Sequence, residues 1–156
     1  MVKVLFVCLG NICRSPMAEA VMRHLIAEEG LEDKITVDSA GTGDWHIGKP
    51  PHQGTREILT KNQISYEGQT ARQLLEQDIS SFDYIIGMDA ENIGNIKRLA
   101  GDFPTNHIKR LLDYAKEFST SDVPDPYYTG NFDEVYEMVT EGCRNLLSEI
   151  KHEYQL

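Results

Sequence analysis

The chain has 156 residues, and 15 basic against 25 acidic residues give it a formal net charge of -10. This length predicts a single domain over residues 1-156, and a hydrophobic fraction of 40% is enough for one sizeable core. The acidic balance argues against nucleic-acid binding, which usually needs a basic stripe. The chain has no run of about 18 apolar residues, which a membrane span would need. The three cysteines are too few for a disulfide scaffold and predict a reducing, cytoplasmic setting.

Strand and helix patterns alternate from the N-terminus, which predicts parallel βαβ units. Residues 2-7 form a short, β-branched and almost uninterrupted apolar run, as in a buried strand. Ser15 and Pro16 then indicate a helix start, with Ser15 as N-cap and Pro16 at the first helical position. Gly30 is placed to end that helix, and residues 35-40 are the next strand candidate. The apolar positions of the helix share one face: Met17, Val21, Met22, Leu25 and Ile26.

The second half of the chain continues the same alternation. A helix is expected over residues 55-62, a strand over 84-88, a helix that Asp89 opens and that runs to about Ala100, and a short strand over 108-112. The last helix has the clearest pattern, an apolar stripe that predicts packing across the sheet. Its members are Phe132, Val135, Tyr136, Val139, Cys143, Leu146, Leu147 and Ile150. We therefore predict an α/β domain with a parallel sheet.

The segment between the first strand and the first helix carries the chemistry. Ligands of parallel sheets bind at the carboxyl ends of the strands, where loop N-H groups and a helix N-terminus form an anion site. Both the helix dipole and a guanidinium would stabilise a Cys8 thiolate, which is a strong nucleophile. Five residues later, Arg14 offers a planar fork for two phosphate oxygens. Gly10 allows a tight curl, and Ser15 can donate a hydrogen bond to the thiolate. The alternative is a buried strand cysteine and a surface arginine.

A nucleophile that displaces an alkoxide or phenoxide from phosphorus benefits from a general acid. Asp125 is the best candidate because Pro124 and Pro126 keep its loop extended. A bound dianion would favour its protonated form by like-charge repulsion. Asp-Pro is also typical of a helix-capping turn, so that interpretation stays open.

The surrounding residue types favour a flat aromatic phosphate ester and no metal. Tyr127, Tyr128 and the single tryptophan, Trp45, could wall a pocket and stack on an aromatic ring, although ordinary partial burial would also explain them. Cys8 and Cys13 have no His/Cys pair at the usual spacing that would complete a zinc tetrahedron.

Several motifs together resemble one enzyme family. Residues 4-19 are similar to the active-site signature of the low-molecular-weight protein tyrosine phosphatases, and residues 125-128 resemble the general-acid loop of that family. Residues 38-42, 82-85 and 88-89 also match in order and approximate spacing. The resemblance covers nearly the whole chain.

The resemblance implies a four-stranded parallel sheet flanked by helices, with a phosphate-binding loop between the first strand and the first helix. It implies a cysteinyl-phosphate intermediate, no cofactor and no metal, with a phosphotyrosine-containing protein or peptide as substrate. Cys8 would be the nucleophile, Arg14 the phosphate clamp, and Asp125 the acid and then the base. The phosphate-binding residues would be Leu9, Gly10, Asn11, Ile12, Cys13, Arg14 and Ser15. Asn11, Ser15 and Ser39 would support the loop, and Trp45, Tyr127 and Tyr128 would form the pocket walls. The oligomeric state stays open between a monomer and a weak dimer.

Related chemistries on the same loop remain as alternatives. Protein arginine phosphatases have threonine where this chain has Ile12, and the apolar side chain fits the tyrosine-directed type better. Arsenate reductases need two further cysteines, whereas here only Cys143 follows Cys13, on an apolar stripe that predicts a core position. A phosphate-binding module without turnover would need neither a nucleophile nor an acid.

Two residues raise finer questions. Many relatives have histidine at the position of Gln69, where it helps to support the active-site loop, and glutamine can still form hydrogen bonds. Cys13 could trap an oxidised Cys8 as a reversible disulfide, or it could only fill space below the loop.

Overall fold

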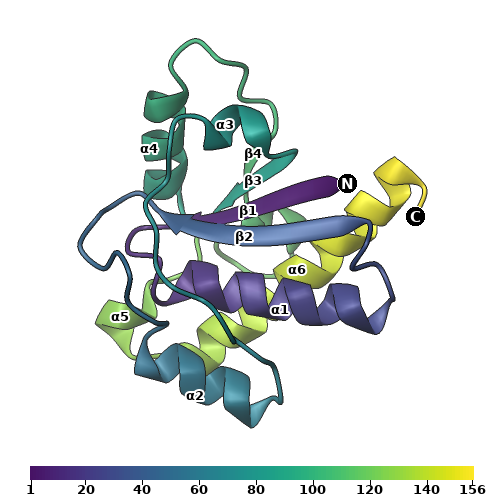
Figure 1. Cartoon of the computed structure of the whole chain (residues 1–156). Coiled ribbons are helices and arrows are strands. Elements are labelled where there is room, and N and C mark those ends of the chain that lie inside the picture. The colour runs from purple at the N-terminus through teal and green to yellow at the C-terminus, as the bar shows by residue number, and fades with distance from the viewer.

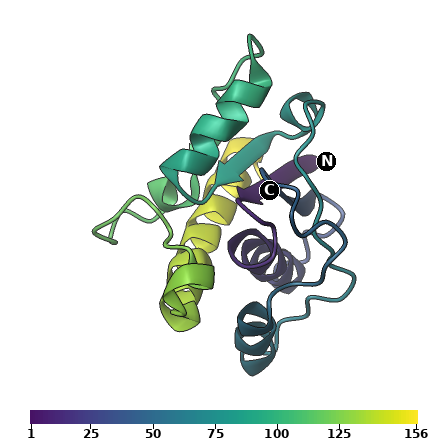
Figure 2. The same cartoon turned by 90° about the vertical axis from the view of Figure 1, so that its left-hand side faces the viewer.

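The computed structural model describes residues 1-156 and has a four-stranded, all-parallel sheet in the order β2-β1-β3-β4, which confirms the predicted fold class. The strands are β1 (Val2–Cys8), β2 (Ile35–Gly41), β3 (Tyr84–Gly87) and β4 (Ile108–Arg110). Their carboxyl ends lie at one edge of the sheet, on the left of Figure 1 and toward the viewer in Figure 2. Because the chain turns into the 3-10 helix η1 (Leu111–Tyr114), β4 is shorter than predicted.

Helices cover both faces of the sheet, because the side chains of β1 alternate between two apolar clusters. Val4 and Phe6 join the larger cluster, on the face covered by α1 (Arg14–Glu28) and α6 (Phe132–Tyr154). Leu5 and Val7 point the other way, toward α4 (Ala90–Ala100). Burial of each such side chain contributes about 1.5-3 kcal/mol. The remaining helices are α2 (Gln53–Lys61), α3 (Asp78–Ser81) and α5 (Pro126–Thr129).

The first helix begins earlier than predicted. It starts at Arg14, and its N-cap residue, Cys13, makes no side-chain capping bond. The expectation that Ser15 caps this helix was wrong, because its hydroxyl lies 3.0 Å from the sulfur of Cys8 instead. At the other end of the helix, Gly30 has a positive φ of 67° and turns the chain away, as predicted.

The later helices agree better with the prediction. Asp89 caps α4, since its Oδ1 accepts a hydrogen bond from the backbone N of Asn92 at 2.8 Å. The apolar stripe of α6 packs into the core, and Leu146 has no exposed surface. The four-residue helices α3 and α5 were not predicted, because elements so short show no periodicity. No helix of the structure combines the length and the apolar character that crossing a membrane requires.

Candidate active site

The loop between β1 and α1 curls around the sulfur of Cys8. The backbone N of Asn11 donates a hydrogen bond to this sulfur at 3.3 Å. Asn11, and not Gly10, takes the left-handed conformation, with φ at 56°, so the expected reason for the glycine was wrong. At Gly10, a Cβ would lie 3.0 Å from Cδ2 of His46, so a larger residue there would press on this ring.

A buried hydrogen-bond network holds Asn11 in this unfavourable conformation. Its Oδ1 accepts a bond from the backbone N of Arg72 at 2.9 Å, which fixes the orientation of the amide. Its Nδ2 donates to Ser15 Oγ at 2.7 Å and to Ser39 Oγ at 3.0 Å. Ser39 in turn donates to Glu19 Oε1 at 2.6 Å. Asn11, Ser15 and Ser39, predicted to support the loop, therefore meet in one network that makes the strained residue tolerable.

This network determines what Ser15 does at Cys8. Because Ser15 Oγ accepts a hydrogen bond from Asn11, its own proton is free to point at the sulfur 3.0 Å away. The sulfur then accepts two hydrogen bonds, from this hydroxyl and from the backbone N of Asn11. It also lies beside the N-terminus of α1, where the helix dipole is positive. These contacts place hydrogen-bond donors around the sulfur that would attack a phosphate.

Arg14 is almost completely buried, and two carboxylates hold it. Its Nη1 donates to Asp89 Oδ2 at 2.7 Å and to the carbonyl of Val123 at 2.9 Å, while Nη2 lies 3.3 Å from Asp125 Oδ2. Burial opposes the charge, but Cys8 and the two carboxylates outweigh it and raise the pKa of Arg14 above its ordinary value. Its buried Nε has no partner within the protein. The guanidinium is thus held in place with its Nε donor still available.

Asp125 uses its two oxygens for different purposes. Oδ1 accepts a hydrogen bond from the backbone N of Tyr127 at 3.1 Å and caps α5, while Oδ2 faces Arg14. The backbone of Asp125 is extended, with φ at -85° and ψ at 109°, as its position before Pro126 predicts. The capping turn and the acid loop, which were alternatives in the sequence, are therefore compatible.

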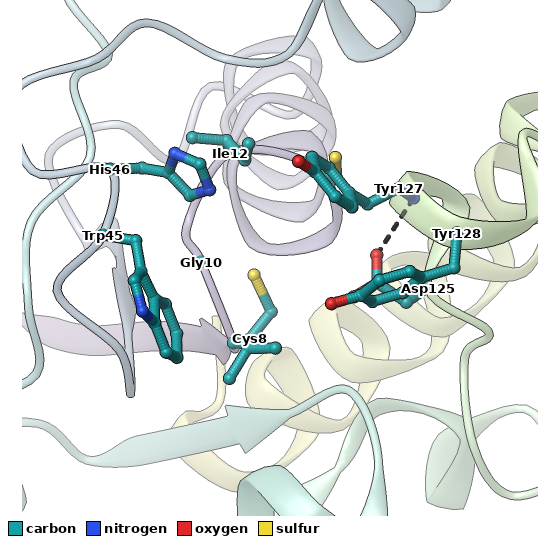
Figure 3. Close-up of a pocket in the computed structure, with 10 residues that line it drawn as sticks. Cys8, Gly10, Ile12, Trp45, His46, Asp125, Tyr127 and Tyr128 are labelled. Atoms are coloured by element: carbon teal, nitrogen blue, oxygen red, sulfur yellow. Dashed lines mark hydrogen bonds between the residues drawn. The ribbon is translucent and has the colours of Figure 1, made fainter.

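The predicted aromatic residues line a pocket of about 330 Å³ above Cys8. Trp45 lies on one wall and Tyr127 and Tyr128 on the other, with Cys8 between them (Figure 3). Trp45 and Tyr128 are 64% and 75% exposed, so they form the mouth of the pocket. This arrangement can hold a flat ring above the sulfur.

His46 is a pocket residue that sequence reasoning missed. Its ring points into the pocket beside Gly10 (Figure 3), and its Nδ1 lies 3.3 Å from Nζ of Lys49. Because an ammonium group can only donate, Nδ1 accepts and Nε2 carries the proton. A single histidine in a loop shows no pattern that could have marked it.

The two other cysteines are buried, as Cys8 is. Burial is the main cause that raises the pKa of Cys13 to about 12, with Cys8 and Asp125 adding to it. Cys143 lies in the core, where burial also raises its pKa, and this confirms the predicted core position. A relay of thiols through Cys143 is therefore excluded by its location. A disulfide between Cys8 and Cys13 stays a prediction.

Gln69 forms its side-chain hydrogen bond just beyond the loop. Its Nε2 donates to the carbonyl of Pro16 at 3.0 Å, in the first turn of α1. Arg72 supports the loop more directly through Asn11, and its guanidinium binds Asp38 at 3.1 Å and Asp78 at 3.0 Å.

Comparisons with known proteins agree with this geometry. Residues 3-156 match the family model described as low molecular weight phosphotyrosine protein phosphatase. The chain is 62% identical, over the full length of both proteins, to the low molecular weight protein-tyrosine-phosphatase YfkJ of Bacillus subtilis. It is 51% identical to PtpA of Staphylococcus epidermidis, covering 96% of this chain and 94% of that one.

Solved structures give the same result. The crystal structure of YfkJ from Bacillus subtilis superposes with a TM-score of 0.96 at 61% identity, covering 98% of this chain and 96% of that one. An arginine phosphatase from Drosophila, DARP, superposes with a TM-score of 0.88 at 33% identity, covering 96% of this chain and 98% of that one. The fold, the geometry of the loop and these matches lead to one conclusion: the chain belongs to the low molecular weight phosphotyrosine protein phosphatase family.

Proposed function

We propose that Cys8, Arg14 and Asp125 carry out phosphotyrosine hydrolysis in this chain, a member of a protein tyrosine phosphatase family. The observation that carries the proposal is the sulfur of Cys8. It accepts hydrogen bonds from Asn11 N at 3.3 Å and from Ser15 Oγ at 3.0 Å, at the floor of a pocket with aromatic walls. A sulfur in this setting is a prepared nucleophile, which a phosphate-binding module would not need.

In the first step, the Cys8 thiolate attacks phosphorus and the bond from phosphorus to the phenolic oxygen breaks. Asp125 gives its proton to the leaving oxygen, so that tyrosine departs as a neutral phenol. Arg14 and the loop N-H groups neutralise charge on the non-bridging oxygens. The product is phosphate bonded to the sulfur of Cys8.

In the second step, a water molecule attacks the same phosphorus and the bond to sulfur breaks. The carboxylate of Asp125 takes the proton of the water, and inorganic phosphate forms. The Ser15 hydroxyl, whose proton points at the sulfur, stabilises the thiolate that leaves. The residues return to their starting protonation states, and no electrons are transferred.

The pocket walls favour an aryl ester over phosphoarginine. The Trp45 and tyrosine rings can stack on a flat ring, and the side chain of Ile12 is an apolar part of the same lining. Because DARP shares this fold and is named an arginine phosphatase, phosphoarginine is the competing substrate to test.

A paired turnover assay with phosphotyrosine and phosphoarginine peptides at pH 6-7, with a chelator present, tests the proposal. We expect preferential hydrolysis of phosphotyrosine that the chelator does not change. Preference for phosphoarginine would overturn the interpretation of Ile12 and leave the nucleophile and clamp in place. Absence of turnover with both peptides would favour the binding module.

A further inference from the structure

A second hollow adjoins the active-site pocket. It has a volume of about 550 Å³ and lies between α4 and the loop that follows β2. Leu9 and Trp45 line both hollows, so the indole of Trp45 stands between them. We call this second hollow the α4 groove. A polypeptide whose phosphotyrosine occupies the pocket can therefore continue over Trp45 into the groove.

The α4 groove has an apolar part and two opposite charges. Leu74 and Leu99 contribute apolar surface, while Glu91 and Arg98 add the charges from one face of α4. The side chain of Arg98 donates a hydrogen bond to the amide oxygen of Asn95, and neither charged residue takes part in an ion pair. Both side chains are exposed and free to bind a partner.

The direction of α4 fixes which charge is nearer to the reaction. The helix begins directly after Asp89, whose carboxylate binds Arg14, and it then runs away from the site (Figure 1). Glu91 is consequently near the pocket and Arg98 far from it. Seven positions at 1.5 Å per residue separate them by about 10 Å, which is about three residues of extended peptide.

We propose that the α4 groove binds the segment of the phosphoprotein that flanks its phosphotyrosine, and that it selects a basic residue near the phosphotyrosine and an acidic residue about three positions beyond. This inference rests on the proposed function of the adjoining pocket. The continuity of the two hollows through Trp45 and the two unpaired charges of α4 carry it. Each partly solvated pair changes kcat/KM by about two- to fivefold, as exposed ion pairs do.

The test uses two kinds of phosphotyrosine peptide. In the complementary peptide the basic residue is near the phosphotyrosine and the acidic residue lies beyond it, and in the reverse peptide the two are exchanged. Each kind is made with the charged residues before the phosphotyrosine and with them after it. The variant Arg98→Glu is compared with Lys97→Glu, an equal charge change on an exposed neighbouring residue that does not line the groove. In one of the two placements, we expect Arg98→Glu to lower kcat/KM for the complementary peptide by about two- to fivefold or more, and Lys97→Glu to change it little. Turnover of p-nitrophenyl phosphate, which cannot reach the groove, should be the same in all three proteins.

The outcomes separate the two proposals. The groove proposal is wrong, and the pocket proposal stands, if the wild type is active on p-nitrophenyl phosphate but hydrolyses all the peptides at the same kcat/KM. The same conclusion follows if Arg98→Glu and Lys97→Glu change kcat/KM for the peptides alike. If the wild type hydrolyses no phosphotyrosine substrate, the function of the pocket itself is wrong. Glu91→Gln provides a second check, because it should reduce the preference for a basic residue near the phosphotyrosine without affecting the distant acidic one.

Discussion

Replacing Asp125 with asparagine separates proton donation from the geometry that positions the donor. The amide oxygen of asparagine can still accept the hydrogen bond from Tyr127 N, so α5 keeps its cap. The lost charge faces Arg14 at 3.3 Å, and this guanidinium retains Asp89 at 2.7 Å. We therefore expect the free energy of unfolding to fall by about 1 kcal/mol or less. Loss of the general acid should lower kcat by about 10²- to 10⁴-fold, or about 2.7-5.4 kcal/mol in the barrier.

Two substrates with different leaving groups measure this effect. Phenol has a pKa near that of tyrosine, about 10, so its oxygen needs the proton more than the oxygen of nitrophenol does. Asp125→Asn should therefore reduce kcat more for phenyl phosphate than for p-nitrophenyl phosphate, while urea unfolding reports the small change in stability. Asp44→Asn, an exposed carboxylate beside the pocket mouth, is the matched control. Equal losses with both substrates, or a loss below tenfold, would show that another group is the acid.

Three further predictions concern the same site. Cys8→Ser should abolish turnover while phosphate binding survives, which calorimetric titration with inorganic phosphate can check; residual turnover would rule out this nucleophile. Asp89→Ala should lower the free energy of unfolding by more than the roughly 1 kcal/mol of a helix cap, because it also leaves the buried charge of Arg14 without its 2.7 Å partner, and a urea titration that showed no loss would contradict this. At pH 8, iodoacetamide should modify Cys8 before Cys13, because burial raises the pKa of Cys13 to about 12 and Cys13 is therefore a thiol at pH 8. Equal labelling rates of the two cysteines in peptide mass spectra would refute this order.

The elements that periodicity marks could be predicted, and the exceptions have local causes. The strands and the stripe of α6 follow directly from apolar patterns. The start of α1 could not be predicted, because Ser15 uses its hydroxyl at Cys8 instead of at the helix end. The end of β4 was placed too late because Leu111 and Leu112 are as apolar in η1 as they would be in a strand.

Within the site, the residues of the contiguous motif could be predicted, while long-range partners could not. Asp89 was recognised as a helix start, but its bond to Arg14 joins positions 75 residues apart, and no local pattern encodes such a contact. The same holds for Arg72, whose backbone reaches Asn11 across 61 residues. The tight curl was assigned to Gly10, whereas Asn11 has the positive φ, and the contact of Gly10 with the ring of His46 has no local sequence pattern.

The position of the acid loop couples enzyme activity to the completion of folding. The thiol and the phosphate loop come from the first βα unit, but Asp125 lies 111 residues after Arg14. Val123 fastens the acid loop in both directions, by donating to the carbonyl of Met88 at 2.9 Å and by accepting from Arg14 at 2.9 Å. A folding intermediate without these bonds has the nucleophile but neither the acid nor the contact of the guanidinium with the Val123 carbonyl. During refolding, phosphatase turnover should therefore appear only when the last third of the chain has docked. The rate at which activity returns then measures the final step of folding.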